Sequence, residues 1–124
     1  MNPKLKFRNG RTKAQFRDDV HVEKIVLVAT GGWWVKENLD RLSFIFKEFA
    51  AVANISFGGA ILRPHAQFMM KDGQLTVDGQ DVIRKIRLAA HELIEKGVMK
   101  EATLEYISKP LISREEYFNR YKQK

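Results

Sequence analysis

The chain of 124 residues contains no cysteine. This absence excludes disulfides, thiolate nucleophiles, thiolate zinc sites and cysteine-ligated iron–sulfur clusters on this chain. The three histidines, His21, His65 and His91, are far apart in the sequence. They form no HxxxH or HExxH pair of the kind that binds zinc on a helix. The sequence therefore predicts neither a metal site nor an iron–sulfur cluster.

Long apolar runs are missing as well. No run approaches the roughly 20 residues that a membrane-spanning helix requires. The basic first residues lack the apolar core of a signal peptide. The sequence also lacks a GxSxG nucleophile turn and a GxxxxGK[ST] phosphate loop. These absences predict a cytoplasmic protein that does not bind a membrane.

The net charge of +7 raises the question of nucleic-acid binding, because clustered lysines and arginines gain affinity when they displace counterions from phosphates. The basic residues are concentrated in residues 1–17, which contain no acidic residue, and in the tail, residues 120–124. Between them the charges alternate in sign, as they do on solvated helix faces. We therefore do not expect specific nucleic-acid recognition, although a small basic nucleic-acid-binding protein stays open as an alternative.

The apolar pattern predicts two strands with a helix between them. Residues 24–30 (KIVLVAT) form a continuous apolar run rich in β-branched residues, which predicts a strand buried on both faces in a parallel sheet. Residues 37–53 carry apolar side chains at helical spacing, and residues 55–62 (ISFGGAIL) predict a second strand. Its Gly58-Gly59 pair indicates a bulge, and Arg63-Pro64 ends it.

The remaining residues predict a loop followed by helices. Residues 65–80 are expected to form a loop with turns at Asp72-Gly73 and Asp78-Gly79. The elements expected after it are a helix over residues 80–96 that Gly97 ends, a short helix or turn over residues 101–107, and a last helix that begins with a capping box of Ser113 and Glu116.

This order of elements predicts an α/β protein with a right-handed crossover. It divides the chain into a basic N-terminal arm (residues 1–22), a β-α-β-α unit (residues 23–97) and short C-terminal helices (residues 98–124). Two parallel strands make a narrow sheet, because three or more are normally needed for stability. The N-terminal arm supplies at most one extra edge strand. We therefore expect either a homo-oligomer or a complementing chain to complete the sheet.

Candidate binding residues follow the two predicted strands, since ligands of open parallel sheets bind beyond the carboxyl ends of the strands. These ends carry Thr30-Gly31-Gly32-Trp33-Trp34 and Arg63-Pro64-His65. Indoles stack on flat rings and arginine binds anions, so the set suits a flat anionic ligand such as a flavin or nicotinamide nucleotide. Alternatively, the two tryptophans pack as a cap over the next helix, Arg63 is a solvated charge and His65 is an ordinary loop residue. The GxGxxG dinucleotide fingerprint is absent.

Four segments together, KIVLVATGGWWVKENLD, FGGAILRPHAQFM, AAHELIEKG and PLISREEYF, resemble the flavodoxin-like family of NAD(P)H-dependent FMN reductases, and most closely its iron–sulfur flavoprotein branch. The resemblance extends over about residues 11–117 and covers only the carboxy-terminal half of the family. It implies a partial flavodoxin-like three-layer α/β/α fold. It also implies FMN binding in which the ring faces Thr30, Gly31, Gly32, Trp33 and Trp34, and Arg63 is a further candidate for stabilising the reduced flavin.

The other half of the family would supply the phosphate-binding loop and the cluster cysteines, so no residue here is expected to bind the FMN phosphate. The resulting hypothesis is half of a flavoprotein, whose FMN site and reductase-like activity require a complementing chain that resembles the amino-terminal half of a flavodoxin. No catalytic residue is assigned. One alternative is a non-catalytic truncated scaffold that self-associates or binds a protein partner. The other is the nucleic-acid binder, with Trp33, Trp34 and Phe7 stacking on bases.

Overall fold

The structure, a computed structural model, describes residues 4–8, 11–15 and 19–122. The elements in chain order are β1 (Lys4–Arg8), β2 (Arg11–Gln15), β3 (Lys24–Thr30), α1 (Glu37–Ala53), β4 (Ser56–Arg63), the 3₁₀ helix η1 (Ala66–Met69), β5 (Met70–Lys71), β6 (Gln74–Leu75), α2 (Val77–Lys96), α3 (Glu101–Ser108) and α4 (Arg114–Lys122).

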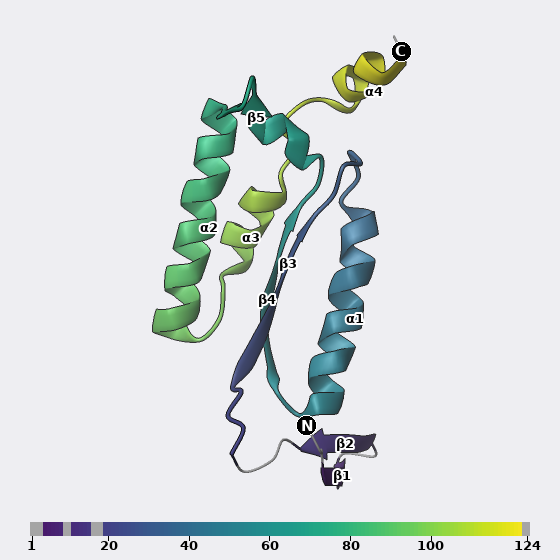
Figure 1. The fold of residues 1–124 in the computed structure, drawn as a ribbon, viewed down its shortest axis with the longest axis vertical. Helices are drawn as coiled ribbons and strands as arrows, with labels where there is room; N and C mark the ends of the chain where they lie inside the picture. The colour runs from purple at the N-terminus through teal and green to yellow at the C-terminus, as the bar shows by residue number, and fades with distance from the viewer. Residues whose placement is uncertain (1–3, 9–10, 16–18, 123–124) are drawn as a thin grey trace.

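A two-stranded parallel sheet of β3 and β4 lies at the centre, with α1 as the crossover between the strands. Figure 1 shows α1 on one side of the sheet and α2 and α3 on the other. The sheet register runs from Lys24 opposite Ser56 to Thr30 opposite Arg63. The mixed α/β class and the two main parallel strands predicted from the sequence are therefore confirmed.

The glycine pair of β4 produces the irregularity that the sequence predicts. The register shifts between Ile25 and Leu27, opposite Gly58 and Gly59. Gly59 has a φ of 128°, and a Cβ atom there would lie 2.7 Å from the terminal methyl carbon of Met99. Only glycine allows both this backbone conformation and this close contact.

The hydrophobic core fills the space between β4 and the helices α2 and α3. Its buried members are Ile61, Val82, Ala89, Met99 and Ile107. Val82 and Ala89 lie seven residues apart on α2 and so share one face of that helix. The core is thus built over β4 rather than over the whole sheet.

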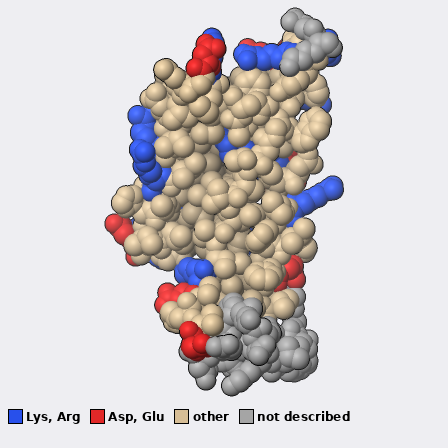
Figure 2. All heavy atoms as spheres, viewed as in Figure 1, with Lys and Arg blue, Asp and Glu red and all other residues tan. Residues whose placement is uncertain are grey.

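The prediction that the first strand is buried on both faces is wrong for β3. Leu27 is 7% exposed, whereas Val26 is 38% and Val28 is 65% exposed. Val28 pairs with Ile61 and therefore shares its face of the sheet. Because α2 and α3 pack over β4, they leave this face of β3 largely uncovered. Figure 2, viewed as in Figure 1, shows uncharged residues over most of the middle of the molecule and charged side chains mainly near its margins.

The described N-terminal residues add no edge strand to the central sheet, which corrects that expectation. β1 and β2 pair with each other in a separate antiparallel hairpin, which Figure 1 shows beside the C-terminal end of α1. Residues 16–18, which follow it, lie outside the described part of the chain. Among the described strands, β3 and β4 pair only with each other.

Three predicted helix and turn signals are confirmed and one is wrong. Asp72 and Gly73 form the turn of the small β5–β6 hairpin, both with positive φ. Gly97 ends α2 in the left-handed conformation. The second predicted turn, at Asp78-Gly79, instead lies in the first turn of α2, because the Thr76 hydroxyl accepts the N–H of Gly79 at 2.9 Å and caps the helix earlier. The last helix begins as predicted, with the Glu116 N–H donating to Ser113 Oγ at 3.1 Å.

Candidate functional site at the carboxyl ends of the strands

The two segments that the sequence singled out lie together beyond the carboxyl ends of β3 and β4. The Gly31 N–H donates to the carbonyl of Arg63 at 3.0 Å, and the His65 N–H donates to the carbonyl of Trp33 at 2.9 Å. The Ala66 N–H then donates to the carbonyl of Gly31 at 3.0 Å. These backbone hydrogen bonds hold the two loops side by side, as expected for neighbouring parallel strands.

Arg63 is almost completely buried, with 1% of its surface exposed. Its guanidinium donates to three main-chain carbonyls: Nε to Pro64 at 2.7 Å, Nη1 to Ile107 at 2.6 Å and Nη2 to Lys109 at 2.7 Å. Burial lowers the pKa of Arg63 to about 10. Since the carbonyls of Ile107 and Lys109 lie at the end of α3, Arg63 fastens the end of β4 to the end of that helix.

His65 is fully buried beside Arg63, in a left-handed backbone conformation with φ 36° and ψ 50°. Its Nε2 lies 3.0 Å from the N–H of Leu111, which can only donate, so Nε2 accepts. The proton of the neutral ring is therefore on Nδ1, which lies 3.2 Å from the carbonyl of Trp34. Burial, and then the charge of Arg63, lowers the pKa of His65 and favours this neutral form.

Trp34 packs into the protein rather than facing a ligand. Its ring is stacked on that of His65, with centroids 6.3 Å apart and planes inclined by 9°. Its indole Nε1 donates to the carbonyl of Ile112 at 3.0 Å. The alternative interpretation of a packed tryptophan therefore describes Trp34 well, although it packs against the segment before α4 instead of capping α1.

The other predicted site residues are more accessible. Trp33 is 71% exposed, and Thr30 and Gly32 are also exposed. The carbonyl of Gly32 accepts the hydroxyl of Tyr117 at 2.8 Å and Nε2 of Gln67 at 2.9 Å. α4 is therefore attached directly to the candidate loop.

Sequence reasoning missed Tyr117, which fixes α4 at this end of the sheet. Its ring lies 5.9 Å from that of Phe68 and 4.9 Å from that of Tyr121, measured between centroids. Burial raises the pKa of Tyr117, so its hydroxyl stays protonated and able to donate. The signal in the sequence was the aromatic spacing of Tyr117 and Tyr121, which places both on one face of the last helix.

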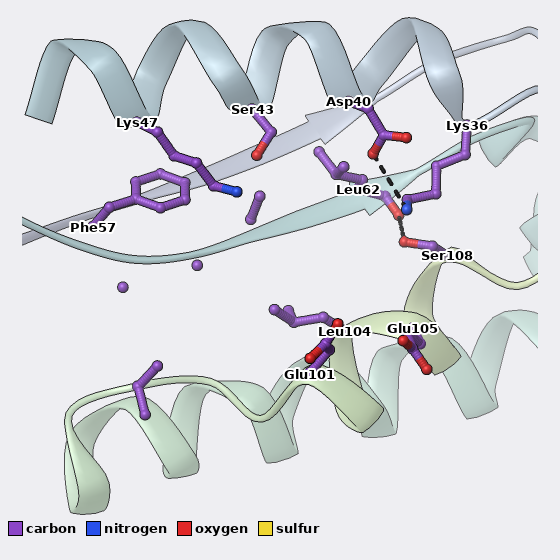
Figure 3. A pocket seen from close by; sticks show the side chains of 14 residues that line it. Lys36, Asp40, Ser43, Lys47, Phe57, Leu62, Glu101, Leu104, Glu105 and Ser108 are labelled. Carbon is purple, nitrogen blue, oxygen red and sulfur yellow. Dashed lines mark hydrogen bonds and ion pairs between the residues drawn. The ribbon is translucent and has the colours of Figure 1, made fainter.

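A separate groove runs along β4 between α1 and α3, with a volume of about 460 Å³. Lys36 and Lys47 of α1 line one wall, and Glu101 and Glu105 of α3 line the other (Figure 3). Lys36 Nζ lies 3.2 Å from a carboxylate oxygen of Asp40. The groove therefore has walls of opposite charge.

Within the described part of the chain, no group of three or more histidine, aspartate or glutamate residues is placed to hold a metal ion. None of the helices there has both the length and the apolar character needed to cross a bilayer. No protein-family model matches the chain, and searches of curated proteins and of solved structures give no significant match.

The geometry separates the predicted site residues into two groups. The polar groups of Arg63 and the indole N–H of Trp34 are engaged inside the protein. Thr30, Gly32 and Trp33 are exposed at the carboxyl end of β3. This end of the sheet thus presents one accessible indole to a ligand or partner, without an accessible cation from the predicted set.

Proposed function

We propose that the chain is an interaction module: an incomplete α/β unit that works as one part of a larger assembly, completed along the outer edge of β3 by another polypeptide. The observation that carries this proposal is Val28, which is 65% exposed in the middle of an apolar strand. Pairing along that edge would remove apolar surface from water, which is the main favourable contribution to protein association.

The two outer edges of the sheet differ in a way that supports the proposal. At the outer edge of β4, the Met99 N–H donates to Gly58 at 3.3 Å and Ser108 Oγ donates to the carbonyl of Leu62 at 2.7 Å. No comparable hydrogen bond covers the outer edge of β3 among the described residues. Natural proteins usually protect sheet edges. This chain covers the outer edge of β4 with its own residues, and the outer edge of β3 stays available for pairing with another polypeptide.

The helix α1, on the other face of the sheet, carries a second exposed apolar surface. Ile45, Phe49 and Val52 are 59%, 55% and 46% exposed, and their spacing places them on one face of α1. The groove-lining residues Lys36 and Lys47 lie on the opposite side of the same helix, toward β4. The exposed apolar face of α1 therefore lies on the β3 side, where a partner would also cover it.

The test compares two exposed valines. Wild-type protein isolated under mild conditions should show a mass above the 14.4 kDa of one chain, measured by gel filtration with light scattering. Val28→Lys should return it to the mass of one chain, because a lysine in the middle of the interface would lose its hydration. Val77→Lys, at a position 73% exposed on α2, is the matched control and should behave like wild type. A wild-type protein with the mass of one chain would contradict the proposal.

A second candidate function is favoured by the exposure of Trp33. By its resemblance to the FMN reductases, the chain would form the ring-facing wall of an FMN site in a flavodoxin-like assembly, and the complementing chain would bind the phosphate. Ring contact would fall to Thr30, Gly32 and Trp33, because the guanidinium of Arg63 is engaged with carbonyls. The flavin would carry the electrons, as cofactors of this kind do. For both candidates we propose a cytoplasmic location and no specific nucleic-acid partner.

The flavin hypothesis is tested on the assembled protein. FMN titration should quench tryptophan fluorescence, and Trp33→Phe should reduce the quenching while preserving a stacking surface. The matched control is Phe118→Leu, at a position 46% exposed on α4, which should leave the quenching unchanged. An assembly that is colourless and does not bind added FMN would refute this second candidate and leave the first intact.

A further inference from the structure

The backbone of β3 directs a defined set of N–H and C=O groups to its outer edge, where no described residue forms a hydrogen bond with them. At one end of the strand the Ser56 N–H donates to Glu23 at 3.3 Å, and at the other the Gly31 N–H donates to Arg63 at 3.0 Å. Odd-numbered residues of β3 therefore bond toward β4, because successive residues of a strand point their backbone groups to opposite sides. The extra residue at the register shift belongs to β4, so the alternation in β3 is unbroken.

The residues whose N–H and C=O groups point to the open edge are consequently Lys24, Val26, Val28 and Thr30. An antiparallel neighbour must place such a residue opposite another outward-pointing residue. A second copy of β3 fulfils this condition when Leu27 faces Leu27 of the copy. Val26 then lies opposite Val28 of the copy, and Lys24 lies opposite Thr30.

From this self-complementarity we infer that the polypeptide that pairs with β3 is a second copy of the same chain, bound antiparallel about a two-fold axis at Leu27. The inference rests on the proposed function and names its partner. In this arrangement the outward N–H and C=O groups of all four residues find partners. The single charged residue of the strand, Lys24, faces a threonine rather than another lysine, so no like charges lie opposite each other.

The two-fold axis also brings the flanking apolar surfaces together. Because the axis is perpendicular to the sheet, α1 of both copies lies on the same face, and the face of Ile45, Phe49 and Val52 meets its own copy. On the other face, Lys24 Nζ donates to the carbonyl of Gly97, so the end of α2 lies beside the start of β3. Ile94, 83% exposed on that helix, is then close to the interface.

A parallel, head-to-tail repeat of the chain does not form a closed pair. It would leave one β3 or β4 edge open at each end and would continue into a filament, whereas a two-fold pair is closed. The hydrogen bonds to the carbonyls of Gly58 and Leu62 also obstruct the outer edge of β4 for such a repeat. The antiparallel pair forms a four-stranded sheet in the order β4-β3-β3-β4 with its protected edges outside.

The natural absence of cysteine allows a direct test of this register. Val26→Cys and Val28→Cys, carrying different tags, are co-expressed and oxidised. Opposite residues of an antiparallel pair lie within disulfide reach, with Cα atoms about 5.5 Å apart. Residues displaced by two positions are about 7–8 Å apart, beyond that reach. The mixture should therefore give at least about fivefold more covalent dimer than either variant alone.

One control and three outcomes make the result decisive. Val77→Cys, exposed but remote from β3, should give no covalent dimer. Equal cross-linking by Val26→Cys alone would overturn the register and with it the inference. If differently tagged wild-type copies fail to co-purify although the assembly is heavier than one chain, the second copy is refuted and the proposed function survives. A protein with the mass of one chain refutes both.

Discussion

Replacing Arg63 with lysine keeps its positive charge but removes the planar guanidinium, and so tests what holds the end of β4. The native side chain donates to the carbonyls of Pro64, Ile107 and Lys109 from three different nitrogens. A lysine is shorter and carries its donors on a single nitrogen. It cannot reach all three carbonyls together, so at least one buried carbonyl loses its partner.

The expected loss follows from the number and type of these hydrogen bonds. A hydrogen bond to a charged group contributes about 1.5–3 kcal/mol, and an unsatisfied buried acceptor costs about 1–3 kcal/mol. Since the variant loses one or two of the three contacts and relaxes around the rest, we expect Arg63→Lys to lower the free energy of unfolding by about 2–4 kcal/mol. This loss is a large part of the total free energy of unfolding of a typical domain, which is about 5–15 kcal/mol.

The assay is equilibrium unfolding in urea, followed by tryptophan fluorescence and circular dichroism at one fixed protein concentration. With a slope of about 2 kcal/mol per molar urea, in the middle of the usual range, the midpoint should fall by about 1–2 M. The matched control is Arg87→Lys, at an exposed position of α2, which should change stability by less than about 0.5 kcal/mol. If Arg63→Lys unfolds at the wild-type midpoint, Arg63 is not a structural contact and its guanidinium is free for a ligand.

Acid should destabilise the fold through His65, because the pKa of this side chain is lowered in the folded state. Its contribution to stability is complete above about pH 6.5, the pKa of an unfolded histidine. As the pH falls toward the lowered pKa, this contribution is lost by at most about 1.4 kcal/mol per pH unit. Urea midpoints at several pH values measure this, and His65→Asn, whose side chain suits the left-handed backbone, should flatten the dependence; an unchanged slope would show that other groups cause it. Gly79→Ala should lower stability by about 2–3 kcal/mol, because its Cβ would overlap the carbonyl oxygen of Met69. Gly32→Ala, with nothing within 4 Å of the added carbon, should be nearly neutral when thermal melts of the two glycine variants are compared, and the reverse ranking would contradict the packing. Thr76→Ala should cost about 1 kcal/mol through loss of the α2 cap, Thr76→Ser should recover most of it, and equal urea midpoints for all three proteins would argue against the cap.

The positions of the main elements could be predicted because local pattern determines them. The strand predicted over residues 24–30 and the helix predicted over residues 37–53 have the same bounds as β3 and α1. β4 is displaced by one residue at each end from the predicted strand. Apolar periodicity, a proline stop and a glycine cap act within a few residues, so they are visible in the sequence.

The role of Arg63 could not be predicted, because its partners are main-chain carbonyls that every residue possesses. Nothing in the side chains of Ile107 or Lys109 indicates that their carbonyls will accept a guanidinium. His65 is similar, since its burial depends on the carbonyl of Trp34 and the N–H of Leu111. The sequence could show that these residues follow the two strands but not that the protein uses them to close its own structure.

The error about β3 is informative in a different way. A continuous apolar run predicts a strand that is buried on both faces, and within one copy only the face of Leu27 is covered. The sequence pattern does not distinguish burial inside a chain from burial against another chain. The exposure of Val28 therefore agrees with the expectation, also drawn from the sequence, that a further polypeptide completes the sheet.

The contacts of Arg63 have a consequence for how the protein is made. Ile107 and Lys109 follow Arg63 by 44 and 46 residues, so at translation rates of about 5–20 residues per second the arginine is synthesised about 2–9 s before its acceptors. Until then, burying the guanidinium would leave its Nη groups without these carbonyl acceptors, at high cost. The end of β4 therefore cannot reach its final packing until Ile107 and Lys109 have been synthesised and have left the ribosome.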